Sequence, residues 1–217
     1  MRRQAGFTLI ELAIVLVIIG LLLGGVLKGQ ELIASAKVKN MAGDFKNVQV
    51  MLYGYQDKFR ALPGDDAGAA THLSGGVVAQ VGELGNAVID GSWDSTDAKD
   101  ESFIFWQHVR LAGLAAGPAD PAVPEYIPRN ADGGRLGVQS LGPFKTAGIT
   151  DATFAGLYVA CSDGVAGKLA KQLDVTLDDG ATNSGAVRVI KKAGMPGASL
   201  AVDKVADSDL FTVCMTF

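Results

Sequence analysis

Proline does not occur before Pro63, and histidine and cysteine occur only twice each in the 217 residues of this chain. The sequence also has no Gly-x-Ser-x-Gly turn, phosphate-binding loop, haem-attachment site or paired metal motif. These absences leave no sign of catalysis. We therefore expect a protein that is not an enzyme and that uses no cofactor or metal. The same absences disfavour the alternative of a membrane-anchored enzyme.

Positive charge is also scarce and is not gathered into a basic cluster. The net charge is −4, and because Arg2 and Arg3 supply two of the positive charges, the rest of the chain carries −6. An acidic chain without a basic cluster is poorly suited to bind nucleic acid. Aromatic residues make up only 7% of the chain, which gives little support to a role in electron conduction.

What the sequence does have is one long apolar run, from Phe7 to Leu27, in which Glu11 is the only charged residue. A helix of about 21 residues is roughly 31 Å long, which matches the hydrocarbon core of a membrane. Arg2 and Arg3 before the run predict a cytoplasmic N-terminus. Residues after Lys28 are then expected to face the periplasm or the exterior.

Two simpler interpretations of this run leave something unexplained. A secretory signal peptide could be cut near Ala34–Ala36, but the run is longer than the usual apolar region of about 7–15 residues and contains an acid. A plain membrane anchor accounts for the length but not for Glu11. A carboxylate inside a membrane span is costly and usually functional.

The stretch Gly6-Phe7-Thr8-Leu9-Ile10-Glu11 closely resembles the processing site of type IV pilins and pseudopilins. The resemblance implies a leader of residues 1–6, cleavage between Gly6 and Phe7 by a prepilin peptidase, and methylation of the new Phe7 amine. It also implies an inner-membrane assembly platform as a partner, and other pilin subunits as neighbours once the chain leaves the inner membrane lipid.

The same resemblance gives Glu11 a role in assembly. In a filament the apolar helices bundle, and the carboxylate of Glu11 can pair with the Phe7 amine of a neighbouring subunit. A buried charge without its partner costs several kcal/mol. We therefore expect the pair to set the register between subunits.

The apolar pattern continues beyond the run. Apolar residues recur at spacings of 4, 3, 4, 3 and 4, which places them on one side of a helix: Met41, Phe45, Val48, Leu52, Tyr55 and Phe59. The sequence thus predicts one helix from about Thr8 to Ala61, with residues 28–62 as its amphipathic continuation. A coiled-coil seam is the alternative, but Gly43 and Gly54 favour a surface onto which a globular head packs.

Four glycines lie in or just after the apolar run: Gly20, Gly24, Gly25 and Gly29. They permit close approach of neighbouring helices. The other interpretation is local melting that lets a filament stretch, because each glycine weakens a helix by roughly 0.8–1 kcal/mol relative to alanine.

Residues 63–217 are predicted to form an α+β head of the type IV pilin kind, with a small antiparallel sheet packed against the long helix. The sequence predicts a helix at 97–116 with one apolar face, strands at 157–161, 186–190 and 210–217, and a helix or strand at 169–177. Residues 64–95 are interpreted as an irregular loop with room for a small strand pair, and 118–130 as a loop.

The two cysteines are expected to form a disulfide if the head is exported. Export would place Cys161 and Cys214 in an oxidising compartment, where an isolated pair forms a disulfide; in the cytosol they would be two buried thiols. Pilins commonly close a C-terminal loop in this way. A loop of about 54 residues would contribute roughly 4 kcal/mol by loop entropy.

The remaining polar groups give weak signals. Calcium would suit the oxygens of an acidic turn formed by Asp174, Asp178, Asp179 and Asn183. The spacing does not match an EF-hand loop, so we expect a solvated turn there. His72 and His108 are expected at the surface or packed in the head, not as ligands or general bases.

The leading functional interpretation is a structural subunit of a type IV pilus-like filament. The alternatives are a pseudopilin of a type II secretion system and a minor pilin whose head binds a surface or another cell. In each case the precursor is expected in a bacterial inner membrane with its head in the periplasm, and the mature chain in an extracellular pilus or a periplasmic pseudopilus.

Overall fold

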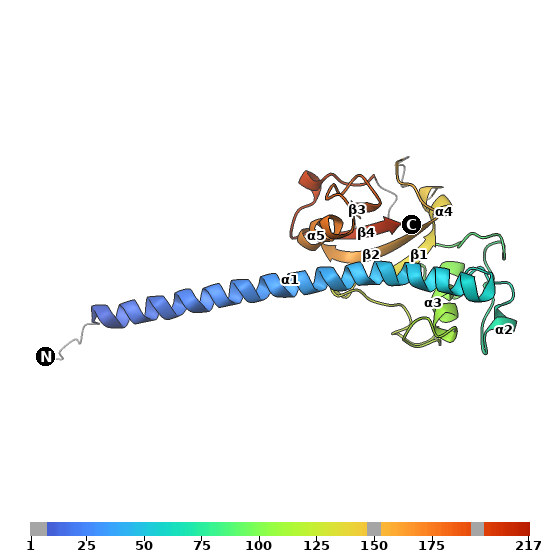
Figure 1. Cartoon of the computed structure of the whole chain (residues 1–217), viewed down its shortest axis with the longest axis horizontal. Coiled ribbons are helices and arrows are strands. Elements are labelled where there is room, and N and C mark those ends of the chain that lie inside the picture. The colour runs from blue at the N-terminus through green and yellow to red at the C-terminus, as the bar shows by residue number, and fades with distance from the viewer. Residues whose placement is uncertain (1–7, 147–152, 192–197) are drawn as a thin grey trace. The chain divides into compact units, whose positions relative to one another are not determined.

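The computed structural model describes residues 8–146, 153–191 and 198–217. The chain divides into two units, Met1–Lys37 and Val38–Phe217. Helix α1, Leu9–Phe59, contributes its first part to one unit and its second part to the other (Figure 1). The long helix predicted from the sequence is therefore confirmed. It ends where Arg60 adopts a left-handed backbone conformation, with φ of 56°.

The head contains a four-stranded antiparallel sheet in the order β1-β2-β4-β3. Its strands are β1 Leu136–Ser140, β2 Tyr158–Ala166, β3 Val187–Lys191 and β4 Leu210–Thr216. The last strand in sequence thus lies in the interior of the sheet, between β2 and β3. The three predicted strands are confirmed, β2 is longer than expected, and β1 had no prediction. The α+β, pilin-like fold class is confirmed.

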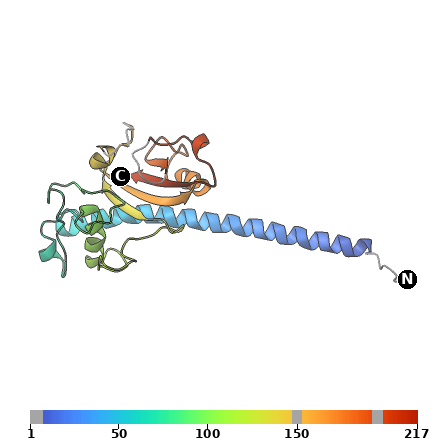
Figure 2. The same ribbon diagram turned by 180° about the vertical axis from the view of Figure 1, so that it is seen from behind.

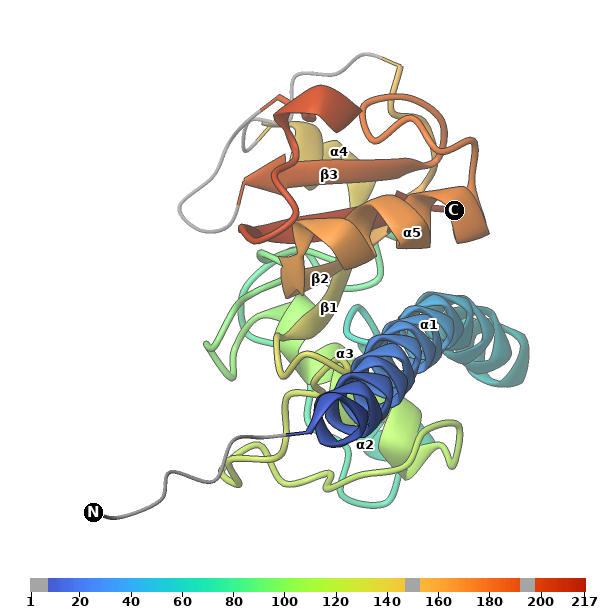
Figure 3. The same cartoon turned by 90° about the vertical axis from the view of Figure 1, so that its left-hand side faces the viewer.

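The head also contains short helices, of which α3, α4 and α5 contact the sheet: α2 Ala69–His72, α3 Glu101–Leu111, α4 Leu141–Thr146, α5 Gly167–Leu177 and a 3-10 turn, Val202–Lys204. Figure 3 shows α5 lying across the sheet, where it contacts β2, β3 and β4. The ambiguous segment 169–177 is therefore helical. The second part of α1 passes between the sheet and the loop that follows α3 (Figures 1, 2 and 3).

The sequence-based prediction for α3 was wrong in two respects. The helix is shorter than 97–116, because Asp97 accepts a hydrogen bond from the Lys99 N–H in a turn before it, and Gly113, with φ of 76°, follows it. It is also not one-sided, since residues 101–109 are all buried. The strand pair allowed for at 64–95 does not form among the described residues; Val81 makes only a single bridge, to Asp100.

The apolar stripe of α1 packs into the head as expected. Five of its six residues are fully buried, and Phe59 is half-buried. On the sheet itself, a separate cluster joins α4 to the central strands: Leu141, Phe144, Phe154, Val159, Cys161, Ile190 and Cys214, with Trp93 packed against it. The head therefore has an apolar cluster of its own besides the residues that pack against the α1 stripe.

Candidate functional site

The start of α1 is fixed by a reciprocal set of hydrogen bonds between Thr8 and Glu11. The Thr8 N–H and hydroxyl donate to Glu11 Oε2 at 2.8 and 2.7 Å, and the Glu11 N–H lies 3.3 Å from Thr8 Oγ1. This is a capping box, in which the carboxylate satisfies a backbone donor at the helix N-terminus. The Thr8-x-x-Glu11 spacing that forms it is visible in the sequence, although we did not predict a capping box there.

The capping box places the Glu11 carboxylate at the N-terminal end of α1. Negative charge is favoured there by the helix dipole. Gly6 and Phe7, where we predicted cleavage and methylation, lie outside the described residues. The cleavage site and the Glu11–Phe7 pairing therefore stay predictions.

The apolar side chains of the first part of α1 are exposed. Leu9, Leu16 and Leu21 are among many in this segment that stand free of the rest of the described chain. The helix is long and apolar enough to cross a membrane, and the most apolar window of it buries nothing inside the chain. These side chains consequently need cover from outside the chain, from lipid or from other helices.

The four glycines of this segment lie in unbroken helix, so nothing in the structure supports local melting. Apart from the neighbouring residues and backbone of the helix itself, a Cβ built on any of them would meet no described atom within 4 Å. They are spaced as two Gly-x-x-x-Gly pairs, Gly20 with Gly24 and Gly25 with Gly29, and this spacing lets helix backbones approach closely in apolar surroundings.

The head is tied together by a disulfide between Cys161 on β2 and Cys214 on β4. The two residues lie directly opposite each other on neighbouring antiparallel strands, with their Cα atoms 4.1 Å apart. The bond expected from the sequence is present. It fixes the C-terminal strand to the interior of the sheet.

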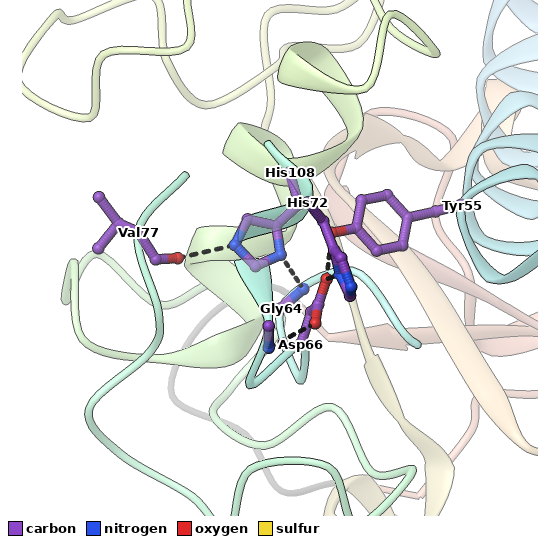
Figure 4. Close-up of polar contacts among 7 residues, drawn as sticks. Tyr55, Gly64, Asp66, His72, Val77 and His108 are labelled. Atoms are coloured by element: carbon purple, nitrogen blue, oxygen red, sulfur yellow. Dashed lines mark hydrogen bonds and ion pairs between the residues drawn. The ribbon is translucent and has the colours of Figure 1, made fainter. Parts of the chain in front are cut away.

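A polar network joins the end of α1 to the loop that follows it (Figure 4). Asp66 Oδ2 accepts hydrogen bonds from the Tyr55 hydroxyl and from His72 Nδ1, both at 2.7 Å, and Asp66 Oδ1 accepts one from the Gly68 N–H. Burial alone would raise the pKa of Asp66, but these bonds bring it below its ordinary value. His72 therefore has a specific partner, Asp66, which the sequence did not predict.

His108 is packed in the head, as expected. Its Nδ1 accepts a hydrogen bond from the Gly64 N–H at 2.9 Å, so the proton sits on Nε2, which donates to the Val77 carbonyl at 2.7 Å (Figure 4). Burial lowers the pKa of His108 and keeps the ring neutral. The hydrogen bonds of this network join α1, α3 and the loop after α1 within the head, so the network positions that loop.

Two buried carboxyl groups were not anticipated. Glu101 is fully buried on α3; its Oε2 accepts a hydrogen bond from the Asp90 N–H at 2.7 Å, while Oε1 has no partner among the described residues. Burial, together with the nearby Asp65, Asp90 and Asp100, raises the pKa of Glu101 to about 7. Asp65 is held differently, by the backbone N–H groups of residues 85–87.

The acidic turn considered for calcium is organised by its own backbone. Asp178 accepts a hydrogen bond from the Val187 N–H at 3.0 Å, and Asp179 accepts one from the Ala181 N–H at 2.8 Å. Asp174 is fully buried, which raises its pKa to about 6. Neither carboxylate oxygen of Asp174 makes a well-formed hydrogen bond with the described residues. The nearby Gly180 N–H lowers the pKa of Asp174, but burial raises it by more. Across the described residues, no group of three or more His, Cys, Asp or Glu side chains is arranged to hold a metal ion.

Comparison with known proteins bears on the N-terminal segment. Residues 1–27 match the family model described as the prokaryotic N-terminal methylation motif. No curated protein sequence shows a significant match to the chain. The matched segment covers Gly6, Phe7 and the capping box, and it continues through the exposed apolar part of α1. The first 27 residues of this chain are therefore the prepilin-type cleavage and methylation segment of type IV pilins, borne by a chain with the long helix and antiparallel sheet of a pilin-like precursor.

Proposed function

We propose that this chain is a structural subunit of a type IV pilus-like filament. In this proposal a prepilin peptidase removes residues 1–6 and methylates Phe7, residues 7–27 serve first as a membrane anchor and then as filament core, and residues 28–62 connect them to the head formed by 63–217. The observation that carries the proposal is the exposure of the apolar side chains in a segment that matches the prepilin motif.

The physical argument concerns what covers these side chains. Each fully buried Leu, Ile or Val is worth about 1.5–3 kcal/mol relative to exposure, so the segment stays in lipid unless another apolar environment replaces it. A bundle of identical helices provides that environment, and the Gly-x-x-x-Gly spacings allow close packing within it. Extraction from the membrane then costs little if it is coupled to docking on the growing bundle.

Glu11 decides where an incoming subunit stops. Its carboxylate is held by Thr8 at the N-terminal end of the helix, and Glu11 follows by four positions the residue whose amine cleavage would create, Phe7. We infer that the Phe7 amine of one subunit pairs with Glu11 of its neighbour. A subunit docked in the wrong register leaves both charges unpaired in apolar surroundings, at a cost of several kcal/mol.

The test uses the full chain in the cells that make it. Glu11→Gln and Glu11→Ala should still insert into the membrane and be processed, but should yield few or no filaments in the sheared surface fraction. Glu31→Gln is the matched control, because Glu31 is an exposed acid on the same helix, paired with Lys28 at 2.7 Å. Filaments at the normal yield from Glu11→Ala would contradict the assembly role.

The place where the protein accumulates separates this proposal from its nearest alternative. A pilus subunit should dominate sheared surface filaments. A pseudopilin should instead stay in the periplasm, and its deletion should block secretion without removing surface filaments. We favour the pilus-like filament and treat loss of secretion alone as the result that would overturn it.

A further inference from the structure

The second part of α1 carries a second stripe, on the side away from the buried one. Its members are spaced 4, 3, 4, 3 and 4, and all but the half-exposed Gly43 are exposed: Lys39, Gly43, Lys46, Val50, Tyr53 and Asp57. The buried stripe has the same spacing, with each of its members two positions later in the sequence. The helix therefore presents two ordered faces: one is buried in the head, and the other is largely exposed, with Tyr53 touching the head at its edge.

An apolar patch lies at the centre of this exposed face, and we call it the Tyr53 patch: Val50, Tyr53, Leu157 and Phe217. Val50 is 68% exposed, Tyr53 44% and Leu157 70%. The rings of Tyr53 and Phe217 are 6.1 Å apart, edge to face, and the Leu157 N–H donates to the Phe217 carbonyl at 2.9 Å. The exposed side of α1 thus meets the C-terminal residue of the chain through Tyr53, and the exposed Leu157 is tied to that same residue by its backbone.

The surface beside the patch is hollowed. An open depression of about 300 Å³ lies on α1 and the residue after it, lined by Tyr53, Gln56, Asp57 and Arg60. A second, of about 220 Å³, shares Gln56 and Arg60 and extends toward the loop after α1. An aromatic residue beside hollows that accept side chains is typical of the energetically important centre of a protein interface.

Charge indicates what docks on this face. Between Lys28 and Arg60 there are six basic and three acidic residues, a net charge of +3. Residues 61–217 hold 11 basic and 19 acidic residues, a net charge of −8. Leaving out the buried Asp65, Asp66, Glu101, Asp174 and Arg188 still gives −5. On balance, residues 28–60 of two copies would therefore repel each other, whereas this segment of one copy and the acidic head of another attract.

We propose that the Tyr53 patch is the docking surface for the head of a second copy of this chain. The contact is heterologous, since the patch of one copy meets a different surface of the next, and such contacts repeat into open filaments. This inference rests on the proposed filament function and adds to it a contact between heads. Bundling of the apolar helices would hold the heads at high local concentration, so a modest patch suffices.

The first test compares two valines of equal exposure. Val50 and Val175 are both 68% exposed, Val50 in the patch and Val175 on α5 outside it. Val50→Glu should lower the yield of sheared filaments about tenfold, because it places a charge in the apolar contact and repels the acidic partner surface. Val175→Glu should leave the yield unchanged. The disulfide and the thermal transition of the head should be the same in both variants.

The second test identifies the partner. A photo-crosslinking amino acid in place of Tyr53 should join two copies of the chain within assembled filaments, and the same group in place of Val175 should not. Crosslinking at position 53 to a different protein, or to none, would overturn the proposal. So would a normal filament yield from Val50→Glu, or an equal loss from Val175→Glu.

These outcomes are distinguishable from failure of the proposed function. If the wild-type chain forms no filaments, the filament function itself is wrong. If wild-type filaments form and depend on Glu11, but Val50→Glu assembles normally, then only the head contact is wrong.

Discussion

The two parts of α1 differ in how their apolar residues are arranged and in their relation to the rest of the chain. In the first part, nearly every large apolar side chain is exposed, and the most apolar window has none of its surface buried inside the chain. In the second part, apolar residues form a stripe that is buried against the head, and Phe45, Val48 and Leu52 have no exposed surface.

The difference shows that one helix serves two environments. An even distribution of apolar residues around the helix suits lipid or a bundle of identical helices, where every side needs cover. A stripe suits a single partner surface within the same chain. The boundary between the two patterns lies near Lys37, where the chain also divides into its two units. The predictions below perturb one part of the comparison at a time.

The largest effect is expected from the buried stripe. Phe45→Ala should lower the free energy of unfolding of the head by about 3–5 kcal/mol, because it removes a fully buried ring and leaves a cavity. Leu16→Ala, in the exposed part of α1, should leave head stability unchanged. Denaturant unfolding of the detergent-solubilised chain, followed by tryptophan fluorescence, measures both. Equal losses from the two variants would contradict the division.

The disulfide should matter next, and only for the head. Replacing Cys161 and Cys214 together by serine should cost about 2–4 kcal/mol of head stability, because the unfolded chain gains the freedom of a long loop. Membrane insertion of the first part of α1 should not change. A drop in insertion together with the loss of head stability would indicate that the two parts depend on each other.

The smallest effect concerns pH and isolates one buried group of the head. The folded-state pKa of Glu101 is about 7, against an ordinary value of 4.5. Between these values the folded chain holds a proton that the unfolded chain has lost, so the contribution of Glu101 is fully present below pH 4.5 and disappears as pH rises through 7. Asp174, with a pKa of about 6, acts in the same direction.

Glu101→Gln should therefore raise the melting temperature at pH 8, corresponding to about 1–2 kcal/mol, and the gain should vanish by pH 5. Glutamine keeps an oxygen to accept the Asp90 N–H but has no charge to bury. Thermal unfolding of both proteins between pH 5 and pH 8 measures this gain. Glu83→Gln, which removes an exposed acid, is the control and should show no such pH dependence. A gain that is the same at both pH values would rule out titration of Glu101 as its cause.

Local patterns in the sequence predicted much of this molecule. Apolar periodicity set the length of α1 and the membership of its buried stripe, and the paired cysteines with an exported head predicted the disulfide. The capping box was also a local pattern, since Thr8 and Glu11 have the required spacing, but the interpretation of Glu11 as an assembly residue concealed its second role.

What could not be predicted depends on contacts between distant segments. Strand β1 is short and contains Gly137 and Gln139, both weak strand formers. Gln139 fits in the strand because its Oε1 accepts a hydrogen bond from the backbone N–H of Trp93 at 2.7 Å. Position 137 needs glycine because a Cβ there would collide with the Trp93 carbonyl. The pairing of His72 with Asp66 likewise follows from the turn that ends α1. Tertiary contacts of this kind leave no periodic signal.

The central claim is that the first part of α1 becomes the core of a filament after cleavage at Gly6. The mass and N-terminal sequence of the protein recovered from cells test it most directly. The account predicts a chain that begins at Phe7 and carries one methyl group on the amine of that residue. A mature chain that still begins at Met1, or that begins after Ala36, would contradict it.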